Sequence, residues 1–174
     1  GEYVITIDFS LTIVGQEGSV VKSGFNIRRP VGQGHIPTED IVRLETMTVA
    51  PPKGVGVHVK DQIKFEGKEL WVDRCSSLDV FLFGALGTMT DCTVTNCVEH
   101  GICCDWGAVL HLYGESTKVT GNSTNGSKHR YGLYVYDEWT SIVLHAPLTK
   151  ESVSQNNGGG GNWHCGERSG KWGG

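Results

Sequence analysis

Cys97, His100, Cys103 and Cys104 are residue types that bind transition metals, and they follow one another with the spacing C-x2-H-x2-C-C. Structural zinc sites usually pair C-x2-C knuckles, with a second knuckle farther along the chain. Adjacent Cys103 and Cys104 would point to opposite faces of a strand, so both could bind one ion only at a bulge. We therefore predict no metal site and no cofactor, and interpret these cysteines as small buried side chains.

Asp105, Asp137, His58 and Lys60 are the candidates for acid–base catalysis. Cleavage of a glycosidic bond needs two clustered carboxylates, and elimination chemistry needs carboxylates with a basic residue. The sequence shows no dense acidic cluster around these positions. We keep the four residues as catalytic candidates for an alternative function and leave open whether the protein is an enzyme.

A repeat with an offset of about 22 residues must position these side chains. The stretch "LWVDRCSSLDVFLFG" (residues 70–84) aligns without a gap with "CTVTNCVEHGICCDW" (residues 92–106). The alignment matches pairs of equivalent residues: Val72 with Val94, Cys75 with Cys97, Asp79 with Gly101, Val80 with Ile102, and Leu82 with Cys104. Looser copies place Val119 and Asn122, and then Val153 and Asn156, in the roles of Val72 and Cys75.

Short strands, polar turns and this period predict an all-β chain, a single-stranded right-handed parallel β-helix with three sheets. We expect one domain over residues 1–174. Two stretches are longer than one coil and predict loop insertions near 29–40 and 122–130, and the glycines from about 157 predict a Gly-rich tail. Cys75, Cys97 and Asn122 are expected to form a ladder at one turn.

Strand alternation predicts which side chains leave the core of the glycine-led strand. One outward column is Asn26, His58, Phe81, Cys103 and Tyr134, and the other is Arg28, Lys60, Phe83, Asp105 and Tyr136. Exposed aromatic rings on a rigid sheet suit sugar rings or a protein partner. The predicted ligand-binding residues are Phe81, Phe83, Asp105, Tyr134 and Tyr136.

The stretch "VITIDFSLTIVGQEGSVV" (residues 4–21) and the turn followed by a glycine-led strand resemble the pectin-lyase-like right-handed parallel β-helix superfamily. The later stretch "YGLYVYDEWTSIVLHAP" resembles uncharacterised β-helix repeat proteins of algae and related microbes. The resemblance to the superfamily implies that the outer face of one parallel sheet carries any active site. It also implies an alternative function, a lyase, hydrolase or epimerase of an acidic polysaccharide, for which calcium could be a cofactor.

The composition limits the classes of partner that the protein is expected to bind. The net charge of −4 argues against nucleic acid, and no apolar run approaches the length of a membrane span. The chain starts at Gly1 rather than Met, which is compatible with a piece of a longer chain. We predict a non-catalytic structural or binding protein that contacts a glycan or a protein surface, with end-to-end or lateral assembly expected at open strand edges and an extracellular location favoured.

Overall fold

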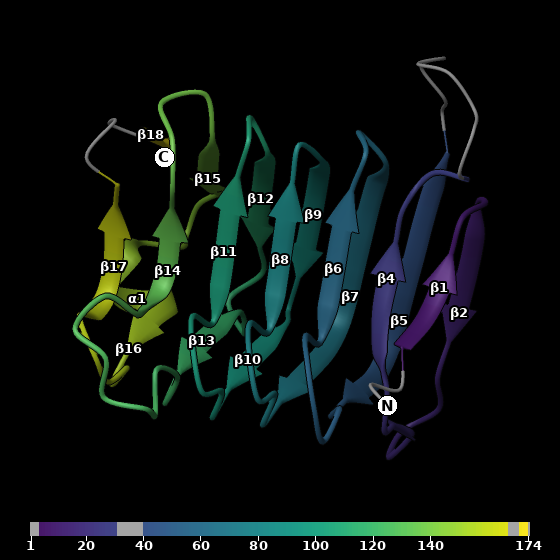
Figure 1. The fold of residues 1–174 in the computed structure, drawn as a ribbon, viewed down its shortest axis with the longest axis horizontal. Coiled ribbons are helices and arrows are strands. Elements are labelled where there is room, and N and C mark those ends of the chain that lie inside the picture. Colours follow the sequence, from purple (N-terminus) through teal and green to yellow (C-terminus); the bar gives the residue numbers. More distant parts are fainter. Residues whose placement is uncertain (1–3, 31–39, 167–170, 174) are drawn as a thin grey trace.

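The computed structural model describes residues 4–30, 40–166 and 171–173, and its strands pair in parallel into two sheets that face each other (Figure 1). The first sheet contains β1 (Val4–Ile7), β4 (Gly24–Ile27), β6 (Val57–Lys60), β8 (Val80–Phe83), β11 (Ile102–Asp105), β14 (Tyr131–Val135) and β17 (Gly161–Cys165). These strands are neighbours in the order in which they occur in the chain. The all-β prediction is therefore confirmed.

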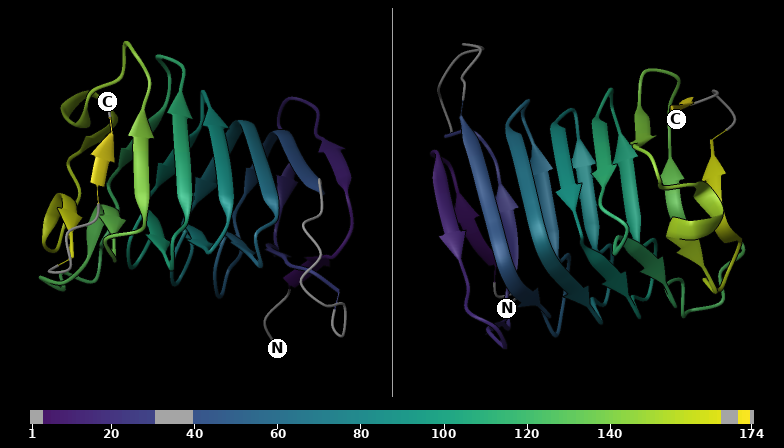
Figure 2. Two further views of the ribbon diagram at one scale, coloured as in Figure 1. Left: turned by 90° about the horizontal axis from the view of Figure 1, so that it is seen from above. Right: turned by 180° about the vertical axis from the view of Figure 1, so that it is seen from behind.

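The second sheet receives the chain after each strand of the first sheet (Figure 2). Its strands are β2 (Leu11–Val14), β3 (Val20–Val21), β5 (Ile41–Val49), β7 (Lys64–Asp73), β9 (Leu86–Thr90), β10 (Thr93–Thr95), β12 (Val109–Tyr113), β13 (Lys118–Thr120), β15 (Ser141–Leu144), β16 (Ser154–Gln155) and β18 (Lys171–Gly173). We use the word coil for the segment from one strand of the first sheet to the next.

The prediction of three separate sheets is wrong, because β5 and β7 join the second and third expected sheets into one. Each of these strands continues around a bend, at Thr46 and Glu69, where φ is 52° in both cases. The first half of β7 pairs with β9, and the second half pairs with β10. The Thr46 hydroxyl donates a hydrogen bond to Glu69 Oε2 at 3.1 Å, which links the two bends.

Aliphatic side chains fill the space between the two sheets and stack from one coil to the next. Val80 pairs with Ile102, and Ile102 pairs with Leu133, so equivalent residues lie about 4.8 Å apart. The side chains predicted to point inward are all buried: Phe25, Ile27, Val57, Val59, Val80, Leu82, Ile102, Cys104, Leu133 and Val135. The predicted alternation in the first sheet is confirmed.

A turn that follows the second sheet carries a chain of polar contacts, which we call the turn ladder. The backbone N–H of Cys75 donates to Cys97 Sγ (3.3 Å), and that of Cys97 donates to Asn122 Oδ1 (3.1 Å). The N–H of Asn122 donates to Asn157 Oδ1 (3.0 Å), and that of Asn157 donates to Asn162 Oδ1 (3.1 Å). Each turn is therefore completed by a side chain that occurs later in the sequence.

The last part of the chain departs from the predicted register by one residue. Val153 and Asn156 are expected to match Val119 and Asn122, but Val119 pairs with Ser154, and Asn157 is in the turn ladder. The cause is helix α1 (Lys150–Val153), which ends at Val153. None of the described helices is long and apolar enough to cross a membrane.

The two expected loops and the tail have different outcomes. Most of the insertion near 29–40 lies outside the described residues, whereas the insertion at 122–130 forms an ordered loop before β14. The Gly-rich tail expected from about 157 is not a tail, because Gly161–Cys165 form β17 and pair with β14. The preceding glycines form the turn that permits this pairing, and φ is positive at Gly159 in this turn and at Gly161, the first residue of β17.

Candidate functional site

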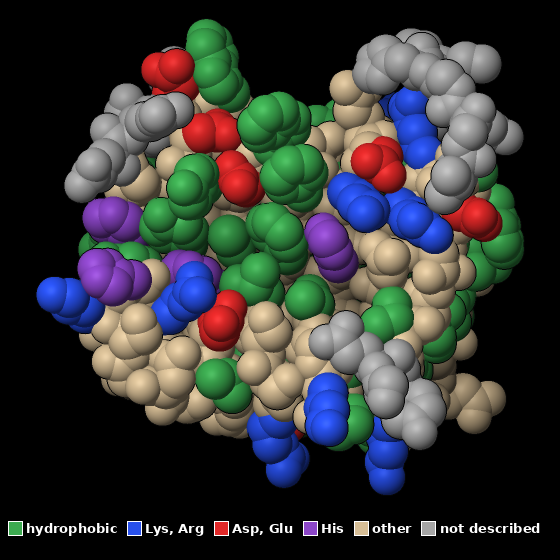
Figure 3. Space-filling view, viewed as in Figure 1, with side chains coloured by type: hydrophobic (Ala, Val, Ile, Leu, Met, Phe, Trp, Pro, Cys, Tyr) green, Lys and Arg blue, Asp and Glu red, His purple; other side chains and the backbone are tan. Residues whose placement is uncertain are grey.

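The outer surface of the first sheet carries the two side-chain columns that the sequence predicts. His58 pairs with Phe81, Phe81 with Cys103, and Cys103 with Tyr134. In the second column, Lys60 pairs with Phe83, and Phe83 pairs with Asp105. Hydrophobic side chains gather over β8, β11 and β14, acidic side chains lie among them, and basic side chains group toward β4 and β6 (Figure 3). We call this surface the aromatic face; its rings are Phe81, Phe83, Trp106, Tyr134, Tyr136 and Trp139.

Five rings of the aromatic face contact one another in two groups, Phe81–Phe83–Trp106 and Tyr134–Tyr136. Phe83 stacks on Trp106 with ring centroids 5.6 Å apart and an angle of 10° between the planes. Phe81 meets Phe83 edge to face at 6.1 Å, and Tyr134 meets Tyr136 in the same way at 5.9 Å. These contacts fix the rings in place before any ligand binds, which lowers the entropic cost of binding.

Three rings of the aromatic face remain strongly exposed. Trp139 is 76% exposed, Trp106 is 69% exposed and Tyr136 is 55% exposed. The sequence places Trp106 and Trp139 close to this face, but they are absent from the predicted binding residues because both lie beyond strand ends, where alternation no longer predicts direction. The signal that could have found them is their position, since each follows a predicted acidic candidate by one or two residues.

Asp105 and Asp137 converge on one backbone group at the centre of this surface. The N–H of Trp106 lies 2.7 Å from Asp105 Oδ1 and 2.8 Å from Asp137 Oδ2. Trp106 has a φ of 56°, a left-handed turn conformation that directs its N–H toward both carboxylates. Asp137 Oδ1 also accepts a hydrogen bond from the Trp139 N–H at 3.0 Å. The structure therefore brings together two of the four catalytic candidates.

The two carboxyl groups have different proton affinities. Burial raises the pKa of Asp105, against the lowering effect of the Trp106 N–H, and the nearby Asp137 adds to the increase. Burial acts in the same direction on Asp137, but hydrogen bonds from Thr140, Trp139 and Trp106 outweigh it and lower the pKa of Asp137. A proton shared by this pair therefore resides on Asp105.

His58 and Lys60 do not join the carboxyl pair. Lys60 is separated from Asp105 by the Phe83 strand, two strand spacings or about 10 Å away. His58 stacks on Phe81 with centroids 4.9 Å apart. Burial lowers the pKa of His58, and the positive charge of Lys60 lowers it further. These two residues therefore lie on the same sheet but at a different place from the acids.

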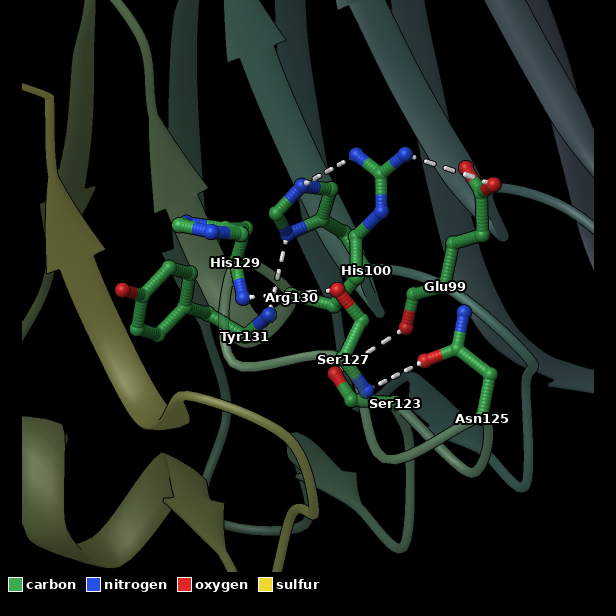
Figure 4. Close-up of polar contacts among 8 residues, drawn as sticks. All are labelled: Glu99, His100, Ser123, Asn125, Ser127, His129, Arg130 and Tyr131. Atoms are coloured by element: carbon green, nitrogen blue, oxygen red, sulfur yellow. Dashed lines mark hydrogen bonds and ion pairs between the residues drawn. The ribbon is translucent and has the colours of Figure 1, made fainter.

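A polar cluster beside the start of β14 was not predicted from the sequence, and Figure 4 shows its residues. The Tyr131 N–H donates to His100 Nδ1 at 3.0 Å, and the His100 ring stacks on Tyr134 at 4.5 Å. The Arg130 guanidinium lies 3.2 Å from His100 Nε2 and 3.4 Å from Glu99 Oε1. Burial and the Arg130 charge lower the pKa of His100 to about 4. The neutral imidazole of His100 thus packs against the Tyr134 ring of the aromatic face.

The cysteines of the segment 97–104 lie on different sides of the strand. Cys104 is in the core between Leu82 and Val135, whereas Cys103 is in the outward column. Cys103 is nevertheless buried, which agrees with the interpretation of these cysteines as small buried side chains. Burial raises the pKa of Cys103 to about 12, and Cys103 and Cys104 are both free thiols.

Comparisons of the chain with protein-family models, with curated proteins and with solved structures found no match.

Proposed function

We propose that the chain is a right-handed parallel β-helix that binds a neutral glycan on its aromatic face. The fold proposal is supported by parallel pairing that follows chain order in the first sheet and by the turn ladder. The pectin-lyase-like resemblance of residues 4–21 supports it as well. The proposed role is binding, and the rigid sheet serves as the platform.

One observation carries the binding proposal: the exposed residues Trp106 and Trp139 donate their backbone N–H groups to a pair of carboxyl groups on the outer surface of the first sheet. The C–H faces of a sugar ring pack on aromatic rings, and its hydroxyl groups donate hydrogen bonds to carboxylates. Trp106 and Trp139 supply exposed rings, and both flank the carboxyl groups of Asp105 and Asp137. This combination favours a carbohydrate over an apolar protein surface, because burying two carboxyl groups in a dry interface is costly.

The negative charge at the carboxyl pair favours a neutral glycan over an acidic one. Within the described part of the chain, no ion pair neutralises Asp105 or Asp137. Arg130, the basic residue of the polar cluster beside β14, is already paired with Glu99. An acidic polysaccharide would meet the negative charge of Asp137 at the centre of the surface. A neutral glycan is therefore the better ligand.

Replacement of Tyr136 and Trp139 together by alanine should weaken glycan binding by about tenfold or more, since each aromatic contact contributes about 0.5–1.5 kcal/mol. Both side chains are exposed, so the fold should persist. The measurement is isothermal titration calorimetry with cellohexaose, xylohexaose and laminarihexaose, and with trigalacturonate as an acidic comparison. The matched control is Trp71→Ala, because Trp71 is 52% exposed but lies on β7 of the other sheet. Equal losses in both variants, or no heat with any neutral probe, would contradict the proposal.

The split in proton affinity between Asp105 and Asp137 favours a second candidate, a carbohydrate-active enzyme. A carboxyl group that keeps its proton can act as a general acid, and an ionised neighbour can act as a base or nucleophile. Asp105→Asn and Asp137→Asn should each lower the release of reducing ends from a polysaccharide by about 100-fold or more. If the parent chain releases no reducing ends from the polymers of the three probe sugars or from polygalacturonate, this candidate is rejected and binding alone remains.

A further inference from the structure

The residue that precedes each inner strand of the first sheet occupies a narrow position, which we call the glycine slot. The strand residues Phe25, Val57, Val80, Ile102 and Leu133 pair in register. The residues just before them are therefore equivalent, and they are Gly24, Gly56, Asp79, Gly101 and Gly132. Four coils have glycine in the slot, and one coil has a carboxylate.

The slot is narrow because it points at the turn ladder. A Cβ atom on Gly101 would lie 2.6 Å from Asn122 Nδ2, and one on Gly132 would lie 2.3 Å from Asn157 Nδ2. A Cβ atom on Gly56 would lie 2.8 Å from Cys75 Sγ. By the same geometry, the side chain of Asp79 is directed toward the ladder residue of the next coil, which is Cys97.

Asp79 is completely buried, and its carboxyl group is unsatisfied. Its exposed fraction is 0%, and within the described part of the chain neither Oδ1 nor Oδ2 has a hydrogen-bond partner. A carboxyl oxygen of Asp79 and the sulfur atoms of Cys75 and Cys97 all lie within 4.8 Å of one another. A buried carboxylate without a partner is strongly unfavourable, so the Asp79 carboxyl group is stable here only as the neutral acid or beside a cation.

We propose that Cys75, Asp79 and Cys97 bind a zinc ion in the interior of the protein. Thiolate sulfur and carboxylate oxygen are both zinc ligands, whereas calcium and magnesium avoid sulfur. Binding displaces the thiol protons and gives the Asp79 oxygens the partner that they otherwise lack. The Cys97 thiol donates to Thr95 O at 3.1 Å, a bond that is lost when zinc displaces the proton, whereas the Cys75 N–H that donates to Cys97 Sγ can support the thiolate.

A disulfide between Cys75 and Cys97 is the alternative to zinc binding by the two sulfur atoms, and it explains fewer of the observations. It would consume both thiols and leave the Asp79 carboxyl group unsatisfied. Both cysteines are free thiols in the structure. The ion explains the cysteine pair and the carboxylate in the glycine slot at once, and it does so independently of the aromatic face.

The test uses the chain produced in zinc-supplemented medium and, separately, refolded with Co²⁺ because the site is buried. Native mass spectrometry should find one zinc ion per chain, and the cobalt form should show thiolate-to-cobalt absorption. Asp79→Gly introduces the glycine that the other four coils have in the glycine slot. Cys97→Asn introduces the asparagine that the following coils have in the turn ladder. Both variants should therefore fold. The amount of zinc bound per chain should be at least about tenfold lower in each variant than in the parent chain. Circular dichroism verifies the fold of each variant.

The control variant is Cys104→Val, since Cys104 pairs with Leu82 and Val135 in the core away from the three ligands. It should keep its zinc and its cobalt spectrum. In the presence of EDTA, Asp79→Gly should unfold at a higher temperature than the parent chain, because it removes the unsatisfied carboxyl group. The proposal is overturned if the parent chain holds neither metal, if Asp79→Gly retains zinc, or if the parent mass is lower by two hydrogens and shows a disulfide.

Discussion

Replacement of Asn122 by alanine should lower the free energy of unfolding by about 3–5 kcal/mol. The side chain is 1% exposed, and its Oδ1 accepts the hydrogen bond from the Cys97 N–H. Its Nδ2 donates to Val94 O at 3.0 Å and to Asn157 Oδ1 at 3.1 Å. Alanine would leave these buried groups without partners and would open a cavity in the turn ladder. Urea unfolding followed by circular dichroism measures the loss.

Two further variants show whether the ladder itself is responsible. Asn125→Ala changes an exposed asparagine of the same loop, whose Oδ1 accepts one exposed hydrogen bond from the Ser127 N–H at 3.0 Å, and it should lower the free energy of unfolding by about 1 kcal/mol at most. Asn122→Cys introduces the residue that serves as acceptor at position 97, and it should recover part of the loss. If Asn122→Ala were no more harmful than Asn125→Ala, the ladder would not hold the coils together.

Acidification should destabilise the protein through His100. The pKa of His100 is about 4 in the folded state, lowered by burial and by Arg130, and an unfolded histidine titrates near 6.5. Between these values the unfolded chain binds the proton and the folded chain does not, so the free energy of unfolding falls as pH falls. The full window from about 6.5 to about 4 corresponds to about 3 kcal/mol. Above pH 6.5 this contribution is complete.

His100→Asn provides the measurement, because an asparagine oxygen can accept the Tyr131 N–H without titrating. Urea unfolding at several pH values between 4 and 7 should show a shallower dependence in this variant than in the parent chain. His129→Asn is the matched control, since His129 is exposed and lies one residue before Arg130. An identical pH dependence in the parent and in His100→Asn would show that His100 carries none of the effect.

Local rules explain why the outer surface of the first sheet could be predicted. The offset that aligns Cys75 with Cys97 also aligns Val80 with Ile102, and the structure pairs these residues. Once a strand has its register, side-chain alternation leaves only one choice for each residue. Phe81, Phe83 and Asp105 were therefore placed correctly without knowledge of the rest of the fold.

The carboxyl pair and the last coil needed information that the repeat does not contain. Asp105 and Asp137 meet because Trp106 adopts a left-handed conformation, which is uncommon for a residue with a large side chain. The register of the last coil shifts because Thr149 and Ser152 cap a single helical turn through reciprocal hydrogen bonds. Both features arise from the conformation of a few residues, and neither alters the hydrophobic pattern.

The burial of His100 could not be predicted from the sequence either. The residue precedes the glycine slot of its coil, and nothing in the sequence distinguishes it from the other histidines. Its surroundings come from Arg130, the last residue of the loop insertion, and from Tyr131, the first residue of β14, and both are distant in sequence. Contacts across such a loop depend on its conformation, which composition alone does not determine.

The direction of the turn ladder implies an order of assembly during synthesis. Cys75 is completed by Cys97, Cys97 by Asn122, and Asn122 by Asn157, so every acceptor is translated after the donor that needs it. During synthesis from the N-terminus, the last turn of the nascent chain therefore has a backbone N–H whose side-chain acceptor has not yet been translated. Asn157 ends this dependence, because Asn162, only five residues later in β17, accepts its N–H.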